Sequence, residues 1–325
     1  MQAVISSIGF WLRQIAKSPL IALSFIVLLA MVIVAIFAPQ IAPYSPNAQS
    51  IAFRLLPPGS DGYILGTDQL GRDVLSRLIW GARLSIGVGF AVMVLTAVVG
   101  VILGIISGYF GGIVDSVIMR LVDMWLAFPF LLLAIALVAV LGQGSDKLIF
   151  ALVLSGWPAF ARPVRGEILQ LREREYVLSA KVLGVPPLSV MFRHLLPNVM
   201  PTILVLAALD LGATILSLAA LAFLGLGVDA ETASWGGMLA SGRNYVATAW
   251  WLSTFPGLVI FAVVMASNLI GDWLRDLFDP RSPFRLGSIS AAARKRLAED
   301  SSSSFPRPAR PEPGTGARPP HDRKA

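Results

Sequence analysis

The stretch Glu175–Asn198, EYVLSAKVLGVPPLSVMFRHLLPN, is the longest polar interruption between two apolar segments of the chain. Its first part contains residues spaced i, i+4, i+7 and i+8, which predicts a helix with one shared face. These residues are Tyr176, Ala180, Leu183 and Gly184. Gly184 suits the end of this helix, because the prolines at 186 and 187 prevent its continuation. We expect a second short helix from Pro187 and the next apolar segment from Pro197, giving a helix, a sharp elbow and a helix at a membrane surface.

The composition of the chain points to a membrane protein. Of its 325 residues, 56% are hydrophobic and only 14% are charged, and the mean hydropathy is +0.74. A soluble domain is far less apolar. Cysteine is absent, which excludes disulfides and Cys-based metal sites, and the two histidines, His194 and His321, lie far apart. We therefore expect neither a resident metal nor a catalytic site in this chain.

The positive charge is concentrated at the C-terminal end. The net charge is +7, yet residues 281–325 hold ten Lys or Arg against four Asp or Glu, so the remainder is nearly neutral. A basic tail beside a membrane is first a determinant of topology, and we expect no nucleic-acid partner. Residues 286–325 lack apolar periodicity and are rich in Ser, Pro and Arg, which predicts a disordered cytoplasmic tail.

The apolar segments predict an all-α, polytopic membrane protein with six transmembrane helices. The segments are 20–38, 84–106, 124–141, 148–161, 199–227 and 250–271. The first one rises about 28 Å as a helix, close to the thickness of the hydrocarbon layer. Arg13 and Lys17 lie within residues 1–19, which predicts a cytoplasmic N-terminus, and six spans then return the C-terminus to the cytoplasm. The fourth segment is short for a span, so either Lys147 and Arg162 at its ends should reach toward the interface or a neighbouring element should cover it.

Sequence features also predict how the spans are connected. Residues 39–83 should be extracytoplasmic, and loop 162–197, which is rich in Arg, should be cytoplasmic. Within 39–83 we expect a short interfacial helix, with direct substrate contact as the alternative. The apolar residues of that helix, which would lie against lipid or protein, are Leu75, Leu78, Ile79 and Trp80.

Residues 84–285 should form the core of the membrane protein, and their sequence predicts helix packing and bends. Small residues of the second span should permit close helix contact. They are Gly87, Gly89, Gly100 and Gly104. We expect a short turn over 108–120, a kink at Pro129, and Trp250 and Trp251 at the outer membrane interface.

The elbow stretch resembles the cytoplasmic "EAA" loop of ABC importer permeases, whose pattern is Glu-Ala-Ala, three residues, Gly, nine residues and Ile-x-Leu-Pro. The chain matches it at Ala180, Gly184, Leu196 and Pro197, and departs from it with Leu178 for Glu, Ser179 for Ala and His194 for Ile. The resemblance implies that this loop docks in a groove of an ATPase subunit. The implied coupling residues are Glu175, Tyr176, Ala180, Gly184, Val185, Pro186, His194, Leu196 and Pro197.

Further motifs resemble the C-type permease subunits of dipeptide, oligopeptide and nickel importers. They are LGTDQLGRDVLSRLI from Leu65, FLGLG from Phe223, SWG from Ser234 and GDWLRDLFDP from Gly271. The resemblance implies a bacterial inner-membrane subunit that is paired with a B-type permease, two ABC ATPases and an extracytoplasmic binding protein. It also implies that ATP and Mg are bound by the partner ATPases, which agrees with the lack of a phosphate-binding GxxxxGK[ST] motif in this chain.

A different class of function is an ion-coupled secondary transporter. Such a protein needs ionisable groups inside the membrane and often has broken helices in repeated halves. We find one such acid, Asp210, and no repeat. Because an unpaired charge in a span costs at least about 2.5 kcal/mol, Asp210 should face protein or water. It could make a structural hydrogen bond or line the transport path.

Overall fold

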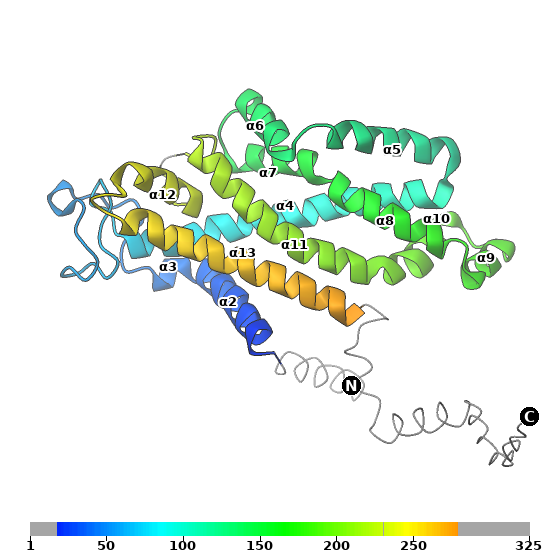
Figure 1. Ribbon diagram of the computed structural model, residues 1–325, viewed down its shortest axis with the longest axis horizontal. Helices are drawn as coiled ribbons and strands as arrows, with labels where there is room; N and C mark the ends of the chain where they lie inside the picture. Colours follow the sequence, from blue (N-terminus) through cyan, green and yellow to red (C-terminus); the bar gives the residue numbers. More distant parts are fainter. Residues whose placement is uncertain (1–17, 230, 279–325) are drawn as a thin grey trace, which may run out of the picture. The chain divides into compact units, whose positions relative to one another are not determined.

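The computed structural model describes residues 18–229 and 231–278, and this part of the chain is helical (Figure 1). Its longer helices are α2 (Pro19–Ile36), α4 (Val74–Phe110), α5 (Gly112–Leu126), α6 (Phe130–Leu141), α7 (Ser145–Gly156), α8 (Pro158–Leu171), α11 (Leu196–Phe223) and α13 (Trp251–Phe278). The shorter ones are α3 (Ala38–Ile41), η1 (Ile51–Phe53), α9 (Glu175–Val182), α10 (Pro187–Val190), η2 (Met191–Leu195), α12 (Trp235–Gly242) and η3 (Arg243–Tyr245). The expected N-terminal segment, apart from its last two residues, and the expected disordered tail lie outside the described residues.

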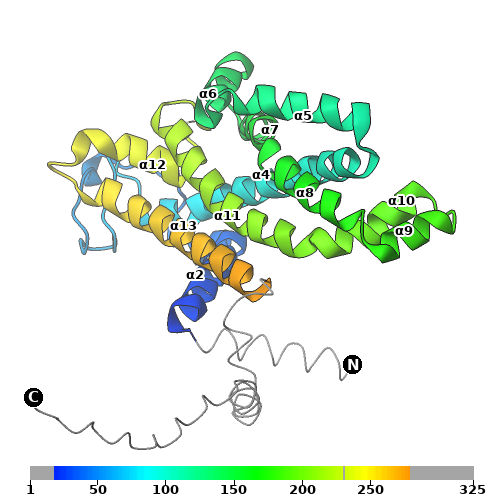
Figure 2. The same cartoon turned by 45° about the vertical axis from the view of Figure 1, so that its right-hand side comes forward.

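The predicted all-α membrane class is confirmed. Five helical segments are long and apolar enough to cross a membrane, and a sixth is obtained if α5 and α6 form one bent span. Helix α4 is central, because it packs against α2, α7, α8 and α11. Helices α9 and α10 lie at one end of these helices, here called the elbow end, and α12 lies at the opposite end with the beginning of α4 (Figures 1 and 2).

The separate interfacial helix expected around Leu75–Trp80 is wrong. These residues form the first turns of α4, which begins at Val74, so the span does not start at residue 84. Asp73 caps the helix by accepting a hydrogen bond from the backbone nitrogen of Ser76 at 2.8 Å. Leu78 is buried, and its carbonyl oxygen accepts a 3.0 Å hydrogen bond from the indole of Trp235. Protein rather than lipid therefore covers this face.

The chain around Pro129 bends much more sharply than a kinked span. The expected turn over 108–120 is mostly helical, because α4 continues to Phe110 and α5 starts at Gly112. Helices α5 and α6 meet at an angle of 86°. Gly111 and Gly112 have φ angles of 65° and 54°, which lets the backbone reverse direction between α4 and α5.

The fourth span is longer than its apolar segment suggested. Helices α7 and α8 together cover 27 residues, Ser145–Leu171, and include Arg162 and Arg165. Arg165 forms two hydrogen bonds of 2.7 and 2.6 Å with the carboxylate of Asp115 on α5, and Arg162 pairs with Asp123. Because these partners compensate the charges, the helix continues where the apolar pattern stops.

Glycines bring α4 and α8 into close contact. A Cβ atom built at Gly100 would lie 2.5 Å from the carbonyl oxygen of Trp157, and one at Gly104 would lie 2.7 Å from that of Ala161. Gly89 is similarly close to Ile215, at 3.0 Å. The prediction of close helix contact is confirmed at these three positions and is wrong at Gly87, where a Cβ would meet no atom within 4 Å.

Enlarging Gly104 is therefore expected to force α4 and α8 apart. Gly104→Leu should destabilise the protein by about 1–3 kcal/mol, the usual effect of overpacking, and should lower the melting temperature of the purified protein. Gly166→Leu is the matched control, since a Cβ at this helical glycine also meets no atom within 4 Å. Equal melting temperatures for the two variants would contradict the assigned packing.

Candidate functional site

The elbow has the predicted helix, turn and helix geometry. Helix α9 ends at Val182, and Gly184 has a φ of 73°, which favours glycine. The backbone nitrogen of Gly184 donates to the oxygen of Lys181 at 3.0 Å, and that of Val185 to the oxygen of Ala180 at 3.1 Å. Helix α10 then begins at Pro187, and Pro197 lies in the first turn of α11. Local sequence therefore determines the path of the elbow.

The inner side of the elbow packs on α4 and α8. Val177, Ala180 and Val190 are buried in one cluster with Ile105 of α4 and Ile168 of α8. The expected shared face of α9 is wrong, because Ala180 is buried whereas Tyr176 and Leu183 are exposed. The inward face instead follows the i, i+3 pair Val177 and Ala180, which meets the apolar side of α8.

The outer side of the elbow exposes large apolar side chains. Val182, Leu183, Leu188 and Phe192 are 87%, 81%, 67% and 59% exposed, and we call these four residues the elbow patch. Gly184 lies within this stretch of the chain, and a Cβ there would meet no atom within 4 Å. Clustered exposed apolar side chains at a helical turn are typical of a surface that binds another protein.

The other predicted coupling residues have mixed environments. Glu175 is the exposed first residue of α9, and Pro186 and Pro197 are also exposed. Val185, His194 and Leu196 are partly buried, and the carbonyl oxygen of His194 accepts a 2.6 Å hydrogen bond from Asn198. Sequence analysis did not select Val182, Leu188 or Phe192 of the elbow patch. The sequence nevertheless marks these three residues as candidates for a binding surface, since they are large and apolar within a polar stretch.

Two basic side chains contact the end of α4, one from the elbow and one from the residue that follows α8. The ammonium group of Lys181 lies 4.8 Å from the ring centroid of Tyr109, a cation–π contact. The guanidinium of Arg172 donates a 3.0 Å hydrogen bond to the carbonyl oxygen of Gly108. The elbow and the end of α8 therefore both contact the same end of α4.

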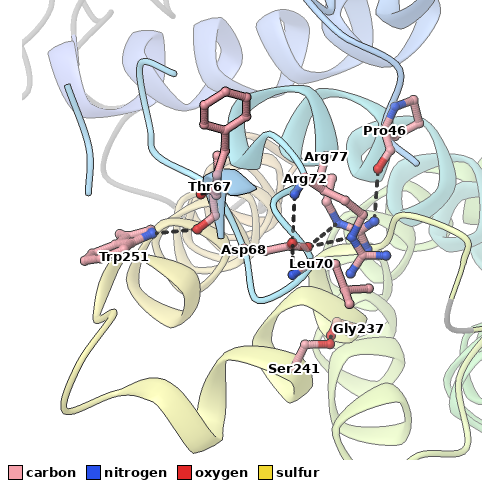
Figure 3. Close-up of polar contacts among 10 residues, drawn as sticks. Pro46, Thr67, Asp68, Leu70, Arg72, Arg77, Gly237, Ser241 and Trp251 are labelled. Atoms are coloured by element: carbon pink, nitrogen blue, oxygen red, sulfur yellow. Dashed lines mark hydrogen bonds and ion pairs between the residues drawn. The ribbon is translucent and has the colours of Figure 1, made fainter. Parts of the chain in front are cut away.

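A buried ion network organises the opposite end (Figure 3). The carboxylate of Asp68 lies 2.7 Å from Nε of Arg72 and 3.8 Å from Nε of Arg77, and all three residues are buried. Asp68 also accepts backbone hydrogen bonds from Leu70 and Arg72 at 2.8 and 2.9 Å. Arg77 reaches the carbonyl oxygen of Pro46 at 3.1 Å. This network holds the chain segment that precedes α4 against the helix.

Trp251 joins α13 to the segment that contains Asp68. Its predicted role as an exposed interfacial aromatic residue is wrong. Trp251 is buried, and its indole donates a 3.2 Å hydrogen bond to the carbonyl oxygen of Thr67 (Figure 3). Its neighbour Trp250 is about half exposed, so the interfacial prediction stays open for that residue alone.

Asp210 lies in the middle of α11. One carboxylate oxygen, Oδ2, is buried and has no hydrogen-bond partner among the residues that the structure describes. The carboxylate lies beside Thr214, one turn further along the helix. The carboxylate thus has an incomplete set of partners, and its unpaired oxygen costs free energy, which favours the path role over the structural one.

Neutral variants of Asp210 are therefore expected to assemble normally but to transport differently. Asp210→Leu should be obtained in at least the wild-type yield, because it removes a buried group that lacks a full set of partners. Asp210→Asn keeps the size and should change the uptake rate or the substrate preference. The measurements are complex yield and uptake in proteoliposomes. A low yield of the Leu variant together with a normal Asn variant would show a structural role instead.

Comparisons with known proteins agree with this architecture. The sequence profile described as "Binding-protein-dependent transport system inner membrane component" matches residues 100–282, and "N-terminal TM domain of oligopeptide transport permease C" matches residues 9–58. The di/tripeptide transport system permease protein DppC of Pseudomonas aeruginosa is 44% identical over 259 residues, which cover 78% of this chain and 86% of the relative. The nickel transport system permease protein NikC of Escherichia coli is 41% identical over 260 residues, covering 80% and 94%.

The fold has a solved counterpart in an inward-facing structure of the MetNI methionine ABC transporter. The TM-score is 0.50 at 18% identity, and the match covers 62% of this chain and 96% of that chain. At this identity the likeness shows the fold alone. The family profile, by contrast, covers more than half of the chain, and the peptide and nickel permeases match most of its length. The chain therefore belongs to the family of binding-protein-dependent transport system inner membrane components and is a transport permease.

Proposed function

We propose that this chain is the C-type permease subunit of an ATP-driven importer for di- or oligopeptides in a bacterial plasma membrane. It forms the translocation path with a B-type permease. Two ABC ATPases bind and hydrolyse ATP with Mg, and an extracytoplasmic binding protein delivers the substrate. The observation that carries this proposal is the elbow patch, a set of exposed apolar side chains at a helical turn that contacts α4 through Lys181.

The elbow patch supports docking to an ATPase. The patch is apolar and surrounds a tight turn, so it can be covered by a groove of matching shape. Lys181 of the elbow contacts Tyr109 of α4, so closure of the ATPases would move the elbow and α4 together. In this arrangement the elbow end and both termini of the chain are cytoplasmic.

The proposal is tested in proteoliposomes that contain this chain, its companion permease, both ATPases and the binding protein. Dipeptide uptake should require ATP and should continue after ionophores have collapsed all ion gradients. Uptake that follows an ion gradient in the absence of ATP would show a secondary transporter instead.

A nickel-chelate importer is the second candidate, because NikC of Escherichia coli is 41% identical to this chain. The same vesicles separate the two substrates. Radiolabelled nickel, with and without a chelator, should fail to accumulate under conditions in which dipeptide accumulates. The reverse result assigns the nickel substrate.

A further inference from the structure

A hollow of about 510 Å³ opens at the end opposite the elbow. It lies between the first turns of α4, the first turns of α7 and the segment between α11 and α12. The residues that matter for its chemistry are Trp80, Arg83, Gly87, Ser145, Glu231 and Thr232. This volume lies within the range of roughly 300–1,000 Å³ that is usual for small-molecule sites.

Gly87 keeps this hollow open. The other glycines of α4 each have a neighbouring atom within 3.0 Å of the position of a Cβ, so helix packing explains them. They are Gly81, Gly89, Gly100, Gly104 and Gly108. A Cβ at Gly87 meets no atom within 4 Å, and the residue lines the hollow. Packing within this chain therefore does not require a glycine here, although glycine costs helix stability of about 0.8–1.0 kcal/mol relative to alanine.

The hollow presents one positive and one negative side chain. Arg83 lies one turn before Gly87 on the same face of α4, and its guanidinium carbon lies 5.8 Å from the ring centroid of Trp80. Glu231 comes from the segment after α11, and these two are the ionisable residues of the lining. Both side chains are exposed. A ligand that carries a carboxylate and an ammonium group matches this pair of charges.

We propose that the hollow is a binding site for the backbone termini of a small peptide, with Arg83 binding the α-carboxylate and Glu231 the α-ammonium group. The site rests on the proposed peptide-importing function and adds a point at which the permease itself recognises its substrate. Asn47, Ser145 and Thr232 supply further hydrogen-bonding groups around the ligand. Gly87 leaves room for the peptide against the wall formed by α4.

The first test fills the hollow in the complete importer. Gly87→Ala, Gly87→Leu and Gly87→Phe should reduce dipeptide uptake progressively with side-chain size, because each larger side chain takes more of the ligand's space. Folding should be preserved, as no neighbour is displaced. Gly166→Leu is the matched control on α8, since it also meets open space. Wild-type uptake by the Phe variant, or an equal loss in the Gly166 control, overturns the site.

The second test assigns the two charges by comparing free, C-terminally amidated and N-acetylated dipeptides. In the wild type, the permease should favour the free peptide, and Arg83→Gln should raise the KM for it by about tenfold, the effect of one lost ionic contact. Arg83→Gln should no longer distinguish the free from the amidated peptide, and Glu231→Gln should no longer distinguish the free from the acetylated one. Because the same binding protein serves every variant, its own selectivity cancels in these ratios.

Two outcomes contradict the site in different ways. If both charge variants lower the uptake of all three peptides equally and weaken the binding protein's affinity for the complex, the hollow is a docking surface for that protein. If the ratios between peptides do not change at all, the site does not bind the termini. Failure of the proposed function is seen separately, since wild-type vesicles would then import no peptide with ATP.

Discussion

Gly184→Arg is expected to leave the chain inserted in the membrane and assembled but to abolish ATP-driven uptake. The position has open space within this chain, so the arginine side chain meets no residue of its own subunit. It extends instead from an exposed turn whose neighbours in the sequence, Val182, Leu183 and Leu188, are also exposed. A long charged side chain there blocks an apolar docking surface and is costly to bury without a partner.

The effect of the large, charged arginine side chain must be separated from the effect of placing any side chain at a backbone position with a positive φ. The φ of 73° at Gly184 disfavours any side chain by about 1–2 kcal/mol, and Asn tolerates this region better than most residues. Gly184→Asn is therefore the control, and it should retain most activity. Uptake and substrate-stimulated ATP hydrolysis are measured in the reconstituted importer, and both should fall at least about tenfold in the Arg variant, which corresponds to a loss of 1.4 kcal/mol or more in coupling. Wild-type values of both quantities would falsify the coupling role of the elbow.

Asp68→Ala is expected to prevent stable folding. The substitution leaves the buried guanidinium groups of Arg72 and Arg77 without their carboxylate, and removing one partner of a buried ion pair costs about 3–5 kcal/mol. It also removes the acceptor for the backbone nitrogens of Leu70 and Arg72, so the segment before α4 loses two of its internal hydrogen bonds. The abundance of the inserted chain and its melting temperature report the loss.

Two further variants make this test specific. Asp68→Asn keeps an oxygen acceptor for the backbone nitrogens, so it should be milder than Asp68→Ala. Asp61→Ala removes an exposed carboxylate of the same segment and should match the wild type. If Asp61→Ala and Asp68→Ala reach the same abundance, the buried network is not what holds this end of the protein.

Features that depend on local chemistry were predictable from the sequence. The elbow followed from Gly184, which needs a positive φ, and from Pro186 and Pro187, which interrupt a helix. The membrane class and the helices α2, α11 and α13 followed from long apolar segments. In each case the decisive residues are close neighbours in the sequence.

Features that depend on distant partners were not predictable. The first turns of α4 resemble an interfacial helix until Trp235 is seen to bond Leu78, 157 positions away. Helix α8 extends through Arg162 and Arg165 because their partners lie on α5. The inward face of α9 is chosen by the apolar surface of α8 rather than by the spacing of Tyr176 and Leu183. Periodicity shows which residues share a side, but the neighbouring helix decides which side is buried.

Helix α4 is long enough to transmit a tilt from one end of the helix bundle to the other. It runs without proline for 37 residues, about 55 Å at 1.5 Å per residue. Its first turns, from Trp80 to Val88, line the hollow, and Gly108 lies near its other end, about 32 Å beyond Gly87. A tilt of about 5° around its centre would shift its two ends in opposite directions by about 2–3 Å each. Such a rigid-body tilt requires no bending within the helix. In the proposed importer, a push delivered at the elbow by an ATPase would then displace the first turns of α4, which line the hollow at the opposite end.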